Sequence, residues 1–261
     1  MLKRAARTAV YALANRLLSR FDPAAPLVLR FQSLPDGEVF ASWLRALAGD
    51  GRPVVPLAAV ADWVRGGDGP PEGAVALTLD GCFASQLERA APALERLRWP
   101  ATFFAPSDHL GGSAEGWKDP ASTSAETRLI GRREVRSLVD RGFDLGSLSA
   151  THRYLPYLRP EDLREELHRA KAELEEIAGR PIEAFAYPYG RFDPETVRAV
   201  EEAGFTRAAT QIPGPVRRED SPFLLPRVSI PERALDPRLF LAHVRGAAKP
   251  LNRLLRYVPL R

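Results

Sequence analysis

Residues 76–85 read ALTLDGCFAS, an apolar run that ends at an aspartate and a glycine. Two later segments have the same form, FDLGSLSATH at residues 143–152 and FAYPYGRFD at residues 185–193. Each segment places polar residues directly after a predicted strand. Active sites of βα barrels gather at the carboxyl ends of the strands, so we expect these three loops to meet over one mouth of the fold.

Short β-rich runs alternate with helical patterns along the chain, which is typical of parallel βα units and predicts an α/β fold. The clearest helix is predicted at residues 160–178, because it begins with proline, carries acids in its first turn and ends before Gly179. The long polar stretch at residues 107–126 follows a strand, where barrels place loops that face substrate. The predicted strands are residues 27–31, 74–79, 101–105, 143–148, 184–187, 207–210 and 225–230.

The two ends of the chain differ from its middle in charge. Five basic residues precede the first acid, Asp22, and five more lie in residues 245–261, which contain no acid. Subtracting these ten charges from the net charge of +4 leaves −6 for residues 22–244. This distribution argues against a nucleic-acid groove across the fold. We predict three parts: a basic amphipathic helix at 1–25, a barrel at 26–244 and a basic tail at 245–261.

Two interpretations of these ends stay open: they pack on the barrel, or they lie on an anionic membrane surface. No apolar run approaches the roughly 20 residues that cross a membrane, and the apolar pattern after Met1 offers no cleavage site of a secretory signal. The single cysteine, Cys82, leaves no internal disulfide, as expected in a reducing compartment. We therefore expect a cytoplasmic protein, with peripheral binding at the inner membrane face as the alternative for its ends.

The three segments, in this order and at these separations, resemble the conserved blocks of the NodB-homology polysaccharide deacetylases, which are like the family 4 carbohydrate esterases. The resemblance covers about residues 26–230 and includes connecting text such as ATFFAP at 101–106 and AVEEAGFTRAAT at 199–210. It implies a distorted (β/α)7-type barrel that removes acetyl groups with the help of a bound metal. A glycan or an N-acetylated sugar is the implied partner.

By this resemblance Asp80 matches the general base of the first block, but Gly81 stands where a second aspartate binds the metal. In the second block His152 matches the second histidine ligand, and Leu148 replaces the first. One of three implied ligands is left. A single imidazole should retain on the order of 4 kcal/mol of binding, which is about millimolar affinity. We therefore expect no cofactor at full occupancy, with zinc or another divalent metal bound only if other residues rebuild the site.

The third block keeps the implied substrate loop, because Pro188, Tyr189 and Gly190 match the turn whose tyrosine amide helps to hold the oxyanion. Near the end of the first strand, where the family often has Tyr-His, this chain has Phe31 and Gln32. Phe31 is therefore a further candidate for substrate binding. The resemblance predicts a sugar groove that persists although the metal ligands are reduced.

Each candidate residue also has a simpler interpretation. Asp80 fits a satisfied loop carboxylate, His152 fits a structural histidine at a turn, and Tyr189 fits packing at the barrel rim. Cys82 with His152 fits a Cys–His nucleophile pair. A small buried residue after a glycine explains Cys82 more simply.

Two function hypotheses follow from these residues. The first is a pseudoenzyme of exopolysaccharide or lipopolysaccharide metabolism, which binds a glycan or an active deacetylase partner without hydrolysis. The second is an active carbohydrate N- or O-deacetylase with Asp80 as base and a metal site rebuilt from residues such as Cys82, Asp108 or His109. The first predicts no stoichiometric metal, and the second predicts acetate release that Asp80→Asn abolishes.

Overall fold

The computed structural model describes residues 22–32, 34–70, 72–115, 117, 127–231 and 236–246. The predicted helix at 1–25 lies outside them except for its last four positions, and only Arg245 and Gly246 of the predicted tail are included. None of the described helices is long and apolar enough to cross a membrane. Binding of the ends to a membrane surface stays a prediction.

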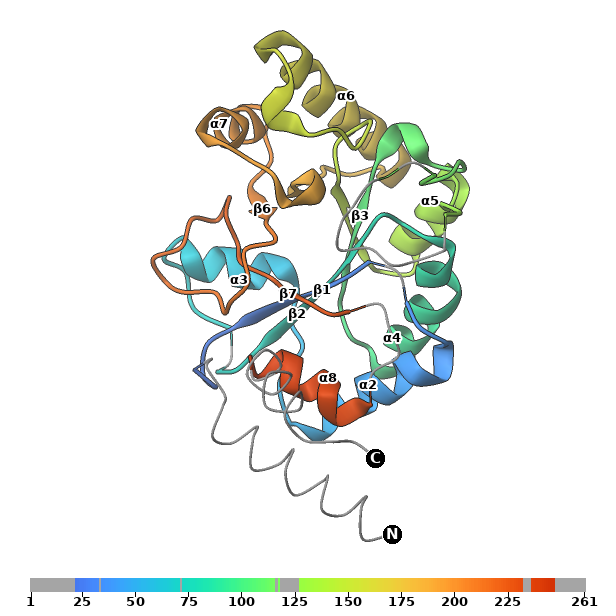
Figure 1. Ribbon diagram of the computed structural model, residues 1–261, viewed down its shortest axis with the longest axis vertical. Coiled ribbons are helices and arrows are strands. Elements are labelled where there is room, and N and C mark those ends of the chain that lie inside the picture. Colours follow the sequence, from blue (N-terminus) through green and yellow to red (C-terminus); the bar gives the residue numbers. More distant parts are fainter. Residues whose placement is uncertain are drawn as a thin grey trace, which may run out of the picture.

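Seven strands form one parallel sheet at the centre of the molecule (Figure 1). The order across the sheet is β6-β5-β4-β3-β2-β1-β7, and every pair of neighbours is parallel. All seven predicted strands are confirmed, although most are shorter than predicted. Their bounds are β1 (Leu27–Phe31), β2 (Val75–Asp80), β3 (Thr102–Ala105), β4 (Asp144–Ser147), β5 (Ala184–Ala186), β6 (Arg207–Ala209) and β7 (Val228–Ser229).

The segment before β7 links the two edges of the sheet. The N–H of Leu225 donates to the carbonyl of Ala208 at 3.0 Å, and its carbonyl accepts from the N–H of Thr210 at 2.9 Å, so this residue pairs with the β6 edge. Directly afterwards β7 pairs with β1 at the other edge. Pro226, between the two pairings, has no N–H to donate to a ladder. The predicted distorted barrel is confirmed, with the predicted strand at 225–230 divided between two partners.

Helices surround the sheet (Figure 1). Helix α2 contacts α8, and α6 contacts both α5 and α7. Helix α6 has the predicted bounds: Pro160 needs no N–H partner in a first turn, and Gly179 ends the helix with φ of 66°. The helices are α2 (Gly37–Gly49), α3 (Leu57–Val64), α4 (Ala91–Leu97), α5 (Arg132–Asp140), α6 (Pro160–Ala178), α7 (Pro194–Glu202) and α8 (Pro237–Val244).

Aromatic rings fill the space between β1 and helices α2 and α8. Phe31 contacts Phe40 and Trp43 with ring centroids 5.5 and 6.4 Å apart, and Trp43 stacks on Phe240 at 5.3 Å. None of the four side chains is more than 2% exposed, and burying each one contributes about 1.5–3 kcal/mol. Because side chains alternate along a strand, this packing turns the neighbouring Arg30 toward the other face of β1.

Candidate functional site

The three predicted loops meet around one small cavity at the carboxyl ends of the strands. Gly81 from the first loop, His152 from the second and Tyr189 from the third all line it, together with Arg30 of β1. The free volume is only about 10 Å³, which is room for about one water molecule. The expected convergence of the loops is therefore observed, but around a nearly filled centre.

Asp80, the last residue of β2, lies at the bottom of this cavity between two guanidinium groups. Its Oδ1 accepts from Nη1 of Arg227 at 2.7 Å, and its Oδ2 accepts from Nη2 of Arg227 at 2.9 Å and from Nε of Arg30 at 2.6 Å. The side chains of Asp80, Arg30 and Arg227 are 4%, 8% and 0% exposed. Burial would raise the pKa of Asp80, but the charges of Arg227 and Arg30 outweigh it and hold this pKa below its usual value.

These contacts bear on the predicted role of Asp80 as a general base. A base must lie within hydrogen-bond reach of the proton that it takes, with an acceptor site available. Three charge-assisted bonds already use most of the roughly four acceptor sites of this carboxylate, and its lowered pKa makes it a weaker base. The role of Asp80 as a base stays a prediction, and the geometry favours the simpler interpretation of a satisfied carboxylate.

Position 81 has no room for a metal-binding side chain. Gly81 has φ of 104°, which L-residues rarely adopt, and a Cβ built here would lie 2.5 Å from Cε2 of Phe83. Leu148, at the other expected ligand position, is 3% exposed and belongs to the apolar cluster that includes Phe104 and Ala186. Neither position offers a donor atom, and the surrounding packing fits the glycine and the leucine.

His152, the one remaining ligand of the implied set, lies between aromatic rings. Its ring centroid is 4.0 Å from that of Trp117 at an interplanar angle of 21°, and 4.5 Å from that of Tyr189 at 54°. Its Nδ1 is buried and has no hydrogen-bond partner among the described residues. Burial lowers the pKa of His152 to about 3, so the imidazole is neutral at pH 7.

The residues present do not fit the metal site that the resemblance implies. Within the described ranges, no group of three His, Cys, Asp or Glu side chains could hold a metal ion. Asp108 pairs with Arg169 at 3.0 Å, and Nε2 of His109 lies 3.1 Å from the carbonyl oxygen of Thr151. Burial raises the pKa of the Cys82 thiol, which disfavours an activated thiolate nucleophile in the metal-free protein. Metal uptake by the purified chain stays a prediction to be measured.

The predicted substrate residues separate into two places. Pro188–Gly190 form one 3-10 turn after β5, and Tyr189 of this turn lines the cavity. A Cβ at Gly190, where φ is 65°, would lie 2.6 Å from Cβ of Gln211, so this close approach requires glycine. Phe31 does not reach the cavity, because its ring packs in the core against α2. Its predicted contact with substrate does not agree with this placement.

Backbone strain gathers in the same three loops. Cys82, Ser149, His152 and Tyr189 have φ values of 55°, 64°, 54° and 57°. Each left-handed non-glycine residue costs about 1–3 kcal/mol and persists only where the surroundings fix it. The hydroxyl of Ser149 helps to do so, since it accepts from the N–H of His152 at 3.1 Å. The loops thus hold a defined conformation although the implied metal ligands are incomplete.

Residues of this site that the sequence does not single out include Arg30, Gln32, Trp117 and Arg227. A signal existed for the two arginines, because each interrupts a predicted apolar strand, and a charge buried in a strand requires a partner. Trp117 lies in the polar stretch that was predicted to face substrate, but nothing in that stretch singled it out. Gln32 was noted only as the replacement for a histidine.

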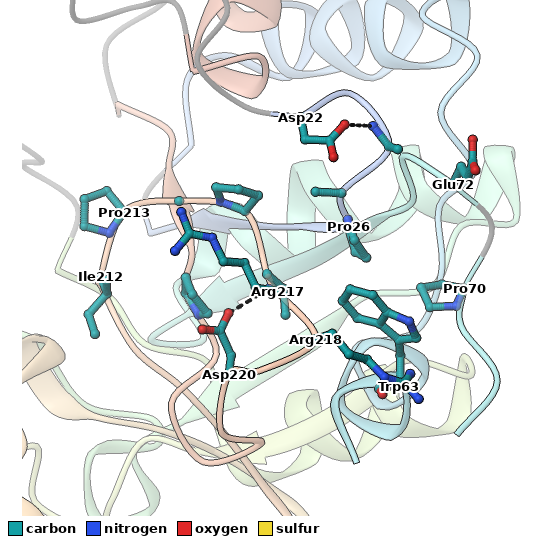
Figure 2. A pocket seen from close by; sticks show the side chains of 16 residues that line it. Asp22, Pro26, Trp63, Pro70, Glu72, Ile212, Pro213, Arg217, Arg218 and Asp220 are labelled. Carbon is teal, nitrogen blue, oxygen red and sulfur yellow. Dashed lines mark hydrogen bonds between the residues drawn. The ribbon is translucent and has the colours of Figure 1, made fainter. Parts of the chain in front are cut away.

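A much larger hollow lies elsewhere in the described part of the molecule (Figure 2). It has a volume of about 820 Å³ and lies between the start of β1, the end of α3 and the loop at 212–220. Its polar groups stabilise the loops around it: the carboxylate of Asp220 accepts from the N–H of Arg217 at 2.7 Å, and Arg218 donates to the carbonyls of Trp63 and Gly67. These contacts indicate a structural role for Asp220 and Arg218.

Comparison with known sequences identifies the family of the chain. Residues 67–208, a little over half of the chain, match the sequence model of the family described as polysaccharide deacetylase. YxkH of Bacillus subtilis (strain 168), which is named as a polysaccharide deacetylase, is 24% identical over 161 residues. This match covers 62% of the chain and 53% of YxkH, so the chain spans about half the length of this curated relative.

Two solved structures have a similar fold. IcaB from Ammonifex degensii gives a TM-score of 0.75 at 23% identity, over 87% of this chain and 99% of IcaB. The Streptococcus pyogenes deacetylase PplD, solved in complex with acetate, gives 0.72 at 17% identity, over 85% of this chain and 99% of PplD. At these identities the likeness shows the fold, and it confirms the predicted barrel.

Proposed function

Because the chain belongs to the polysaccharide deacetylase family, we propose that it binds N-acetylated glycan chains without hydrolysing them. One observation carries this proposal: both oxygens of Asp80 are held by the guanidinium groups of Arg30 and Arg227. Two buried cations neutralise the one carboxylate that matches the family's base. In this arrangement Asp80 stabilises the barrel rather than accepting a proton.

The neighbouring positions support the same proposal. Metal-assisted hydrolysis depends on a metal that activates water and polarises the reacting carbonyl group. Gly81 and Leu148 supply no donor atoms for such a metal, and His152 is enclosed by aromatic rings. The groups that persist at the mouth are rings and a rigid turn, which bind and orient a sugar but do not cleave it.

The proposal is tested with hexamers of N-acetylhexosamine in several linkages, each with and without added zinc, cobalt or nickel. Binding is measured by calorimetry, and free acetate is measured by NMR after long incubation. We expect saturable binding of at least one hexamer, with no acetate above that of a mock preparation from cells lacking the chain. The unaltered protein is used, so the result does not depend on a variant that fails to fold.

Two results would overturn the proposal. Acetate release above the mock preparation would establish an active deacetylase, and loss of this release in a folded Asp80→Asn protein would support Asp80 as its base. If none of the hexamers binds, the proposed glycan binding is wrong. Circular dichroism of the variant distinguishes loss of a base from loss of the fold.

A further inference from the structure

A row of five aromatic rings leads from the Asp80 cavity to the protein surface. Trp117 stacks on His152, and His152 contacts Tyr189. Tyr189 in turn stacks on Tyr154, with ring centroids 4.2 Å apart and an interplanar angle of 9°. Tyr154 contacts Tyr157 at 6.1 Å and 37°. The row joins the second and third loops of the mouth to the 3-10 turn at Leu155–Tyr157, which precedes α6.

Trp117, at the inner end of this row, is half-buried, and exposure rises along the outer part from His152 to Tyr157. His152 is 8% exposed, Tyr154 and Tyr189 are half-buried, and Tyr157 is 86% exposed. Among the described residues, the exposed large hydrophobic side chains are Tyr157 and, at 46%, Ile212. The fold gains little from the ring of Tyr157, because a side chain left in water contributes no burial energy. Its ring is therefore open to contact with a ligand.

We propose that Tyr154 and Tyr157 form an outer sugar subsite, continuous with the mouth of the barrel. One face of a pyranose ring carries C–H groups, and such a face stacks on an aromatic ring while its hydroxyl groups remain in water. A tyrosine suits this contact because it is apolar along its ring and polar at its hydroxyl. The stack on Tyr189 fixes the ring of Tyr154 before binding, which lowers the entropy lost when a sugar docks.

The net charge of residues 22–244 favours a glycan over a nucleic acid, which would also stack on aromatic rings. Nucleic-acid binding depends on basic side chains that neutralise phosphates, whereas residues 22–244 carry a net charge of −6. The row is also continuous with the centre where the family's glycan would lie. The subsite thus rests on the proposed glycan binding and gives the place where an outer sugar of the chain would bind.

Trp117 provides a direct measurement, since it is the one tryptophan of four that belongs to the row. Its fluorescence is followed while the hexamer that binds best is added, and the titration is repeated with the monosaccharide. We expect Tyr157→Ala to weaken hexamer binding about three- to tenfold, the effect of losing one good aromatic contact. Monosaccharide binding should not change. Tyr157→Phe should keep most of the affinity, because the ring remains.

Ile212→Ala is the matched control, because Ile212 is also exposed but lines the separate hollow near α3. Hexamer affinity should not change in this variant. Wild-type hexamer affinity in Tyr157→Ala would overturn the subsite, whatever the fate of the proposed function. If the chain instead hydrolyses the hexamer, the proposed function fails. The subsite would still be supported if Tyr157→Ala raised KM for the hexamer without changing kcat.

Discussion

Replacing Asp80 by asparagine should destabilise the protein strongly, because it leaves two buried guanidinium groups without their counter-ion. The carboxylate accepts three charge-assisted bonds of 2.6 to 2.9 Å from Arg30 and Arg227. Asparagine keeps one acceptor oxygen but turns an NH₂ group toward a cation. Removing one partner of a buried ion pair typically costs about 3–5 kcal/mol. We expect this loss in the free energy of unfolding.

The free energy of unfolding of wild type and variant is measured by urea denaturation, followed by tryptophan fluorescence. Equal m-values for the two proteins show that the comparison is valid. Asp140→Asn is the control, because Asp140 pairs with Arg136 at 2.8 Å but both side chains are at least half exposed. Such a surface pair contributes about 0.5 kcal/mol or less. Adding Arg30→Met to Asp80→Asn should recover part of the loss, since it removes one uncompensated charge.

A loss no larger than that of the surface control, about 0.5 kcal/mol or less, would refute this reasoning. It would mean that water or an anion solvates the two guanidinium groups in solution. Asp80 would then be free to accept a proton, and its contacts with Arg30 and Arg227 would no longer oppose hydrolysis. Failure of Arg30→Met to recover any stability would likewise show that charge repulsion is not the cause.

Three further predictions follow from the mouth of the barrel. Gly81→Asp with Leu148→His should lower the melting temperature and recruit no stoichiometric zinc, because Phe83 blocks position 81; bound zinc measured by elemental analysis would contradict this. Wild-type protein purified without added metal should contain far less than one equivalent of zinc, cobalt or nickel by the same analysis. The pKa of His152, about 3 when folded, lies below its ordinary value of about 6.5, so the unfolded chain binds the proton first. The contribution of neutral His152 to the free energy of unfolding is therefore complete above about pH 6.5, and it falls by up to about 1.4 kcal/mol per pH unit toward pH 3. Urea titrations at several pH values should show that the free energy of unfolding depends less on pH in His152→Gln than in wild type. An unchanged pH dependence would contradict the lowered pKa of His152.

Features set by neighbouring residues could be predicted from the sequence. The bounds of α6 follow from Pro160 and Gly179, which act within one turn of each helix end. The positions of the three loops follow from the apolar runs that precede them. The absence of ligand side chains at Gly81 and Leu148 is also local, because it depends only on residue identity.

Features that depend on contacts distant in sequence could not be predicted. Arg30 reaches Asp80 because β1 pairs with β2, and Arg227, which directly precedes β7, reaches it because β7 pairs with β1. The register of the β7–β1 pairing cannot be predicted from the sequence of either strand alone. The stack of Tyr154 on Tyr189 likewise joins two loops whose relative position is set by β4 and β5.

The placement of Arg227 gives Asp80 a structural reason to be present without catalysis. Nε of Arg227 donates to the carbonyl of Thr210 at 2.7 Å, and Nη1 donates to Oγ1 of Thr78 at 3.1 Å. One fully buried guanidinium therefore links β2, the chain after β6 and the segment that closes the barrel. A cation in that position needs an anion beside it, and Asp80 supplies it. Loss of any activity in Asp80→Asn would accordingly not identify a base unless the barrel stays closed, whereas acetate released by the unaltered chain would.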